Sequence, residues 1–157
     1  MKILAIDPGT KCGWACNTDP MQYGTLNLAT KREEGGGMRY VRLRKKLTEL
    51  NVNLGGVDMV VYEEVRRHLG TDAAHVYGGI TAVIQMWCEG YEIPYLSVPV
   101  GKIKKHATGK GNAPKSDVVD AVWLDHKLFN RPTEDEADAI ALLDWAVASY
   151  GEVATYE

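Results

Sequence analysis

An apolar run at residues 58–63 constrains the fold of this chain more than any other feature of its sequence. The run reads DMVVYE, and its apolar residues follow one another instead of alternating with polar ones. Short β-branched runs of this kind form strands that are buried on both faces, as in parallel sheets covered by helices. Residues 2–7, KILAID, form a second run of strand length. Together the two runs favour an α/β fold.

The remaining pattern adds strands and helices on either side of these runs. We expect further strands at residues 13–17, 22–28 and 94–98, which gives a mixed five-stranded sheet flanked by helices. Helices are expected over about residues 40–54, 71–89, 115–128 and 133–150. No long linker divides this order, so we expect a single domain over residues 1–157.

Composition and the first residues predict the compartment. Hydrophobic residues make up 45% of the chain, which is enough for a core without disulfides. The N-terminal apolar run turns polar at Asp7 and no stretch reaches membrane-spanning length, so we expect a cytoplasmic protein with no membrane partner. In that reducing compartment Cys12, Cys16 and Cys88 would be buried thiols.

Charge is distributed unevenly along the chain. The formal net charge of -3 argues against a generally basic nucleic-acid binder. Residues 101–115 nevertheless contain lysines and no acid, whereas acidic residues dominate after Ser116. The lysines of this strip are Lys102, Lys104, Lys105, Lys110 and Lys115. A basic strip beside an acidic region suits a metal-dependent enzyme that acts on a polyanion.

Acidic residues end both of the apolar strands. Asp7 closes the first strand and Glu63 the second, so neighbouring strands would deliver two carboxylates to the same end of the sheet. A single acid of this kind is more often a solvated turn residue, but two on adjacent strands indicate a site. Because side chains alternate along a strand, only one of Glu63 and Glu64 can lie on the Asp7 side.

The segment TEDEAD at residues 133–138 supplies the third group of acids. Thr133 and Glu136 have the spacing of a capping box, so we expect Glu136 to be structural. Asp135 and Asp138 share a helix face, although Asp135 could also serve only to complement the helix dipole. Asp138 enters a helix that is apolar almost all round, where an unpaired carboxylate is costly and a metal ion would stabilise it.

Four clustered carboxylates repel one another unless cations bind between them. Ligation by oxygen alone favours Mg²⁺, with Mn²⁺ as a substitute, over zinc. Two such ions, about 4 Å apart, activate a water and stabilise the departing oxygen in phosphodiester hydrolysis. The sequence therefore predicts a Mg²⁺ site built from Asp7, Glu63, Asp135 and Asp138.

Four separated motifs, AIDPGTKCGWA, VVYEEV, GKIKKHATGKGNAPKSDV and DEADAIALL, resemble in order those of RuvC-type Holliday junction resolvases, particularly the short viral forms. The resemblance spans nearly the whole chain. It implies a ribonuclease H-like fold and a homodimer that nicks four-way DNA junctions with Mg²⁺ during DNA recombination and repair, in the host cytoplasm if the protein is viral. By resemblance the four acids are catalytic, and Lys104 and Lys115 lie near the scissile phosphate.

One segment departs from the family pattern. Cellular members place an aromatic residue that stacks at the junction centre just after the strand of the catalytic Glu, whereas this chain has Val65, Arg66, Arg67 and His68. Charge replaces stacking there, so Arg66 and Arg67 join the predicted DNA-binding residues. The expected dimer would place a face of the helix at 71–89 at its interface, unless that face packs on the sheet. The candidates on it are Ala74, Tyr77, Gly78, Thr81 and Gln85.

Three other functions fit parts of the pattern. A nuclease of the same fold could act on flaps, forks or RNA in hybrids, and a junction-binding module could have lost catalysis. A small-molecule phosphotransferase is disfavoured by chain length and by the lysine strip. Residues 109–116 nearly match a phosphate-binding loop, but Pro114 lacks the N–H that such a loop needs, so we expect no nucleotide cofactor.

Overall fold

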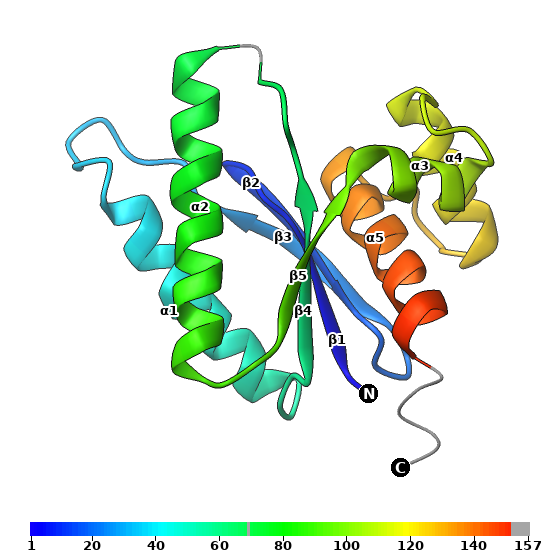
Figure 1. Ribbon diagram of the computed structural model, residues 1–157, viewed down its shortest axis with the longest axis horizontal. Helices are drawn as coiled ribbons and strands as arrows, with labels where there is room; N and C mark the ends of the chain where they lie inside the picture. Colours follow the sequence, from blue (N-terminus) through cyan, green and yellow to red (C-terminus); the bar gives the residue numbers. More distant parts are fainter. Residues whose placement is uncertain (69, 152–157) are drawn as a thin grey trace.

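A mixed five-stranded sheet forms the centre of the computed structural model, which describes residues 1–68 and 70–151 (Figure 1). The strands lie in the order β3-β2-β1-β4-β5. β1 pairs antiparallel with β2 and parallel with β4, while β2 pairs antiparallel with β3 and β4 pairs parallel with β5. Their bounds are β1 Ile3–Asp7, β2 Lys11–Cys16, β3 Gln22–Asn27, β4 Met59–Glu64 and β5 Tyr95–Pro99. This arrangement confirms the predicted sheet.

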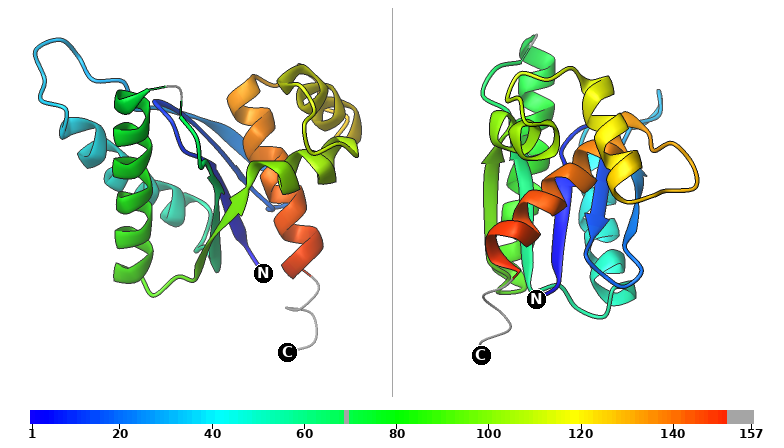
Figure 2. Two further views of the ribbon diagram at one scale, coloured as in Figure 1. Left: turned by 45° about the horizontal axis from the view of Figure 1, so that its top comes forward. Right: turned by 90° about the vertical axis from the view of Figure 1, so that its right-hand side faces the viewer.

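Helices cover both faces of the sheet, as the unalternating apolar strands require. α1 and α2 lie on one face, and α3, α4 and α5 lie on the other (Figures 1 and 2). Along β1 the buried side chains alternate between the two cores, with Ile3 and Ala5 facing α5 and Leu4 and Ile6 facing α1 and α2. The bounds are α1 Met38–Asn53, α2 Thr71–Gly90, α3 Val100–Thr108, α4 Lys115–Asp125 and α5 Glu134–Tyr150.

The helix α3 was not expected from the sequence. It begins directly after β5 and ends where Gly109 adopts a left-handed conformation with φ of 87°. Its nine residues bury only Ile103, so they carry no repeated apolar spacing that would predict a helix. The lysine strip is therefore partly helical. α4 is also shorter than predicted, because it ends at Asp125 and Lys127 takes a positive φ.

The structure also bears on the cysteines and on membrane-spanning segments. The three cysteines are free and buried, which confirms that they occupy the core as thiols. Within residues 1–68 and 70–151, no helix is both long enough and apolar enough to cross a membrane.

Candidate metal centre

The pairing of β1 with β4 brings two carboxylates together. The strands run parallel, with Ile6 opposite Tyr62, so the next residues, Asp7 and Glu63, emerge side by side at the same end of the sheet. Alternation directs Glu63 into the cleft that Asp7 lines, while Glu64 lines a neighbouring hollow and lies 3.2 Å from Arg66. The register thus distinguishes the two glutamates as their alternation predicted.

The N-terminus of α5 carries the other two acids to this end of the sheet. The predicted capping box is present: the Thr133 hydroxyl accepts from the Glu136 amide at 3.2 Å, and the Glu136 carboxylate accepts from the Thr133 amide at 3.0 Å. This cap fixes where the helix begins. Asp138 therefore projects from the second turn of a helix that places seven other residues in the core.

Gly13 lets the first turn of α5 rest directly on the sheet. It lies opposite Asp7 in the pairing of β1 with β2. A Cβ atom at Gly13 would stand 2.0 Å from the carbonyl oxygen of Asp135, which is far inside contact distance. Any larger residue would push the helix, and with it the Asp138 carboxylate, away from Asp7.

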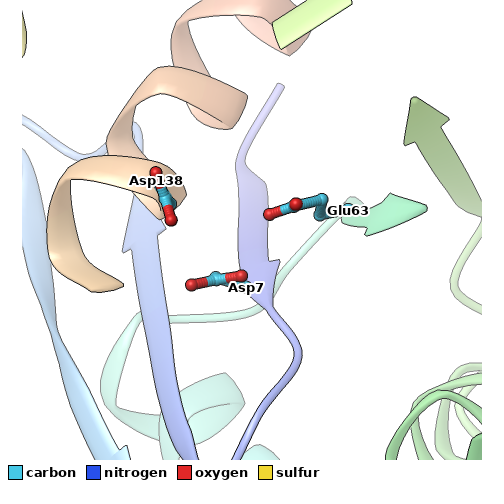
Figure 3. A group of neighbouring side chains, drawn as sticks. All are labelled: Asp7, Glu63 and Asp138. Carbon is cyan, nitrogen blue, oxygen red and sulfur yellow. The ribbon is translucent and has the colours of Figure 1, made fainter. Parts of the chain in front are cut away.

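Three carboxylates converge at this point. Asp7, Glu63 and Asp138 each offer one oxygen, and these oxygens lie within 4.8 Å of one another (Figure 3). Asp135 is not part of that close set, but it lines the same cleft of about 330 Å³. Hard oxygen donors in a partly buried group of this size fit Mg²⁺ or Mn²⁺.

The electrostatics of the cleft favour a bound cation. Burial, reinforced by the charges of Glu63 and Asp138, raises the pKa of Asp7 to about 10. Burial and the charge of Glu63 likewise raise the pKa of Asp138 to about 7. The cluster therefore holds protons that a metal ion would displace, because a divalent cation stabilises the ionised carboxylates.

Three lysines line the same cleft. Lys104 from α3 and Lys115 from the start of α4 were predicted there, and Lys11 from β2 was not. Burial lowers the pKa of Lys115, but attraction to Asp138 and the other acids outweighs it and leaves the pKa above its usual value. Lys115 is thus a cation beside the carboxylates, with Glu134 at 4.0 Å.

The other predicted DNA-binding residues lie outside the cleft. Lys102, Lys105 and Lys110 are exposed on α3 and the turn that follows it. Arg66 and Arg67 line the hollow of about 410 Å³ beside the cleft, where Glu64 and Val100 form other parts of the wall. None of the described cleft-lining residues is a histidine.

Lys11 is the cleft residue that sequence reasoning missed. It follows the Asp7-Pro8-Gly9-Thr10 turn and begins β2, so the chain folds back and returns it to the side of Asp7. A tight antiparallel return after a strand-ending acid was the available signal, because such a turn keeps its flanking residues close.

Comparison with known proteins identifies the family. No protein-family model matches the chain. The crossover junction endodeoxyribonuclease RuvC of Halorhodospira halophila is 30% identical over 146 residues, covering 89% of this chain and 86% of that protein. This chain belongs to the RuvC family. The RuvC of Synechococcus sp. (strain RCC307) is 28% identical, covering 90% of this chain and 95% of the relative.

Solved structures of Holliday junction resolvases share the fold of this chain. Thermus thermophilus RuvC in complex with a Holliday junction substrate has a TM-score of 0.80 at 21% identity, covering 99% of this chain and 97% of that one. The yeast mitochondrial Holliday junction resolvase has a TM-score of 0.65 at 14% identity, covering 98% and 80%. These likenesses confirm the ribonuclease H-like RuvC fold. The relatives named here do not test the predicted viral origin, which stays a prediction.

Proposed function

We propose that this chain is a Mg²⁺-dependent, structure-selective endodeoxyribonuclease that nicks Holliday junctions and related branched DNA. The convergence of the Asp7, Glu63 and Asp138 oxygens within 4.8 Å carries the proposal. Lysines beside that cluster suit a polyanionic substrate, and the matched relatives are crossover junction endodeoxyribonucleases. The function is accordingly part of DNA recombination and repair.

The acids hold the metal in this proposal. Asp7, Glu63 and Asp138 supply the central ligands, and Asp135 supplies a further carboxylate from the cleft wall. When bound, Mg²⁺, or Mn²⁺ in its place, activates the attacking water and stabilises charge on the departing oxygen. The lysines that line the cleft would hold the phosphodiester beside these acids.

The lysines and arginines bind the DNA backbone. Lys104 and Lys115 line the cleft of the acids and contact the scissile phosphate, and Lys11 lines the same cleft from β2 of the sheet. Lys102, Lys105 and Lys110 extend this contact along α3, and Arg66 and Arg67 extend it through the adjoining hollow. Such phosphate contacts give affinity without reading base sequence.

A homodimer completes the proposal, because a four-way junction has approximate two-fold symmetry and each site cuts one strand. A C2 dimer places identical sites on opposing strands. The helix face first considered for the interface is largely occupied within the chain: Gln85 donates to the Tyr62 hydroxyl at 2.7 Å and Thr81 is 8% exposed. The outward side of α2, where Met86 is 58% exposed, is therefore the better interface.

Cleavage of labelled substrates tests the proposal. Four-way junction, flap, fork, duplex, single-stranded DNA and an RNA–DNA hybrid are incubated with Mg²⁺, with Mn²⁺ and with EDTA. We expect paired nicks in the junction that require either metal. Junction binding without cleavage would identify a silent binding module instead, and preferred cleavage of flaps, forks or hybrids would identify a different nuclease of this fold.

Three predictions from the sequence, on domain organisation, location and nucleotide binding, remain predictions. We propose one domain over residues 1–157, a cytoplasmic location with no membrane partner, and no nucleotide cofactor. Sedimentation at micromolar concentration, with and without junction, measures the dimer directly: a chain that stays monomeric on the junction contradicts it.

A further inference from the structure

Tyr77 on α2 contacts the backbone on both sides of the point where β4 ends. Its hydroxyl donates a hydrogen bond to the carbonyl oxygen of Glu63 at 2.8 Å and accepts one from the amide of Val65 at 3.1 Å. We propose that Tyr77 is a positioning residue that fixes the Glu63 carboxylate for metal binding. The inference rests on the proposed metal-dependent function, and it concerns a residue outside the acidic cluster.

The sheet holds Glu63 on one side only, because the pairing of β4 with β1 ends before this residue while its pairing with β5 continues through it. The register of β4 with β1 ends at the Ile6–Tyr62 pair, one residue before Glu63, whereas on its other side Glu63 pairs with Val98 of β5. β4 itself ends at Glu64, and beyond the half-buried Val65 the side chains of Arg66 and Arg67 are exposed. The two bonds of one hydroxyl span residues 63 to 65, so they restrain the backbone from which the Glu63 side chain projects.

The tyrosine is itself held in place from the helix side. Its backbone carbonyl accepts from the Thr81 hydroxyl at 3.0 Å, and the following turns of α2 bury Ile80 and Ile84 in the core. The Tyr77 ring lies against His68, with ring centroids 4.9 Å apart.

The chain contains a matched control one residue before Glu63. Tyr62 also joins β4 to α2, since its hydroxyl accepts from the side-chain amide of Gln85 at 2.7 Å. This bond lies in the core on the α1 and α2 side of the sheet and touches no backbone atom of Glu63. Tyr62→Phe therefore removes one hydrogen bond between the same two elements without releasing the carboxylate.

The two variants are compared in their response to Mg²⁺. Tyr77→Phe keeps the ring and loses only the hydroxyl, as Tyr62→Phe does. The midpoint of unfolding is followed as Mg²⁺ is added to wild type and to each variant, and the Mg²⁺ concentration for half-maximal junction cleavage is measured beside it. We expect Tyr77→Phe to need about tenfold more Mg²⁺ in both measurements, as is typical when a residue that orients a metal ligand is removed.

Tyr62→Phe should show a lower unfolding temperature in EDTA but the Mg²⁺ dependence of wild type. Equal Mg²⁺ dependence in the two variants, shifted or unshifted, would overturn the positioning role, because a merely structural hydroxyl affects both alike. If wild type responds to Mg²⁺ and the two variants respond alike, the positioning role of Tyr77 is rejected while the metal centre is retained. If wild type itself shows no response to Mg²⁺, the proposed metal centre is rejected, and the positioning role of Tyr77 is rejected with it.

Discussion

The two faces of the sheet differ in what their helices do. On one face α5 is buried beneath α3 and α4, and seven of its residues are in the core. On the other face α1 and α2 remain exposed on their outer sides, and α1 buries only Leu43 and Leu47. The α5 face supplies Asp138, Lys104 and Lys115 to the cleft, whereas the α2 face contacts the site through the hydrogen bonds of Tyr77.

This difference shows how a costly charge is accommodated. A helix with seven buried residues can hold a carboxylate such as Asp138 against neighbouring acids, because its apolar packing fixes the backbone. Burial, together with the charges of the neighbouring acids, raises the pKa values of Asp7 and Asp138 in that arrangement. Substitutions on the α5 face should therefore affect chemistry first, and those on the α2 face, Tyr77 excepted, stability first.

The largest effect is expected from removing charge in the cluster. Asp7→Asn and Asp138→Asn should each lower single-turnover junction cleavage on the order of 10³-fold or more, because the shape stays but metal binding is lost. Both variants should bind junctions normally and, in EDTA at neutral pH, unfold at a higher temperature than wild type. A cleavage rate within a few-fold of the wild-type rate in either variant would contradict the metal-site assignment.

The neighbouring glutamates give the next sharpest contrast. Glu63→Gln should be inactive, since its carboxylate lies in the cleft, whereas Glu64→Gln should retain activity because Glu64 lies beside Arg66 in the adjoining hollow. The same cleavage measurement compares them. The reverse result would place the register of β4 off by one residue.

Gly13→Ala tests the seating of α5 on the sheet. The added Cβ would meet the Asp135 carbonyl, so we expect a loss of about 1–3 kcal/mol in the free energy of unfolding. Because a displacement near 1 Å costs on the order of 10²-fold in rate, cleavage should fall by about that factor. Gly24→Ala in β3 is the control, since its Cβ meets only the Trp14 side chain at 3.1 Å. Equal effects of the two changes would contradict the role of Gly13.

A smaller effect is expected from the cleft lysines. Lys115→Ala and Lys104→Ala should weaken junction binding and reduce the slope of log affinity against log salt by about 0.9 for each lost phosphate contact. Lys127→Ala, two residues beyond the end of α4 and outside the cleft, should leave that slope unchanged. If neither cleft variant alters the slope in binding titrations, the lysines face away from DNA.

Much of this architecture could be predicted from local pattern. The unalternating runs that end in Asp7 and Glu63 fixed the parallel strands, and the spacing of Thr133 and Glu136 gave the start of α5. These features depend on neighbouring residues in the sequence. The convergence of the acids then followed from the rule that parallel strands end at the same edge.

What was missed depends on tertiary contacts. The contact of Gly13 with Asp135 joins residues far apart in sequence, and nothing around Gly13 indicates a helix above it. Tyr77 was considered only as part of a helix face, because a side chain that bonds the backbone 14 residues away leaves no periodic signal. α3 escaped prediction because one buried residue, Ile103, defines no amphipathic pattern.

The central claim, that the sheet end holds repelling carboxylates for a metal, is tested most directly by unfolding temperature against pH. Folded Asp7 and Asp138 keep protons that the unfolded chain releases near pH 4, so without metal stability falls as pH rises, up to about pH 7 for Asp138 and about pH 10 for Asp7.

Wild type and Asp7→Asn are compared between about pH 5.5 and about pH 8, in EDTA and in Mg²⁺, because metal binding competes with these protons. The contribution of His126, whose pKa is raised by its hydrogen bond to Asp144, also falls with rising pH but is common to both proteins. We predict a steeper fall for wild type in EDTA, and a Mg²⁺ stabilisation that grows with pH and is lost in Asp7→Asn. Parallel pH curves for the two proteins, with no response to Mg²⁺, would contradict the claim.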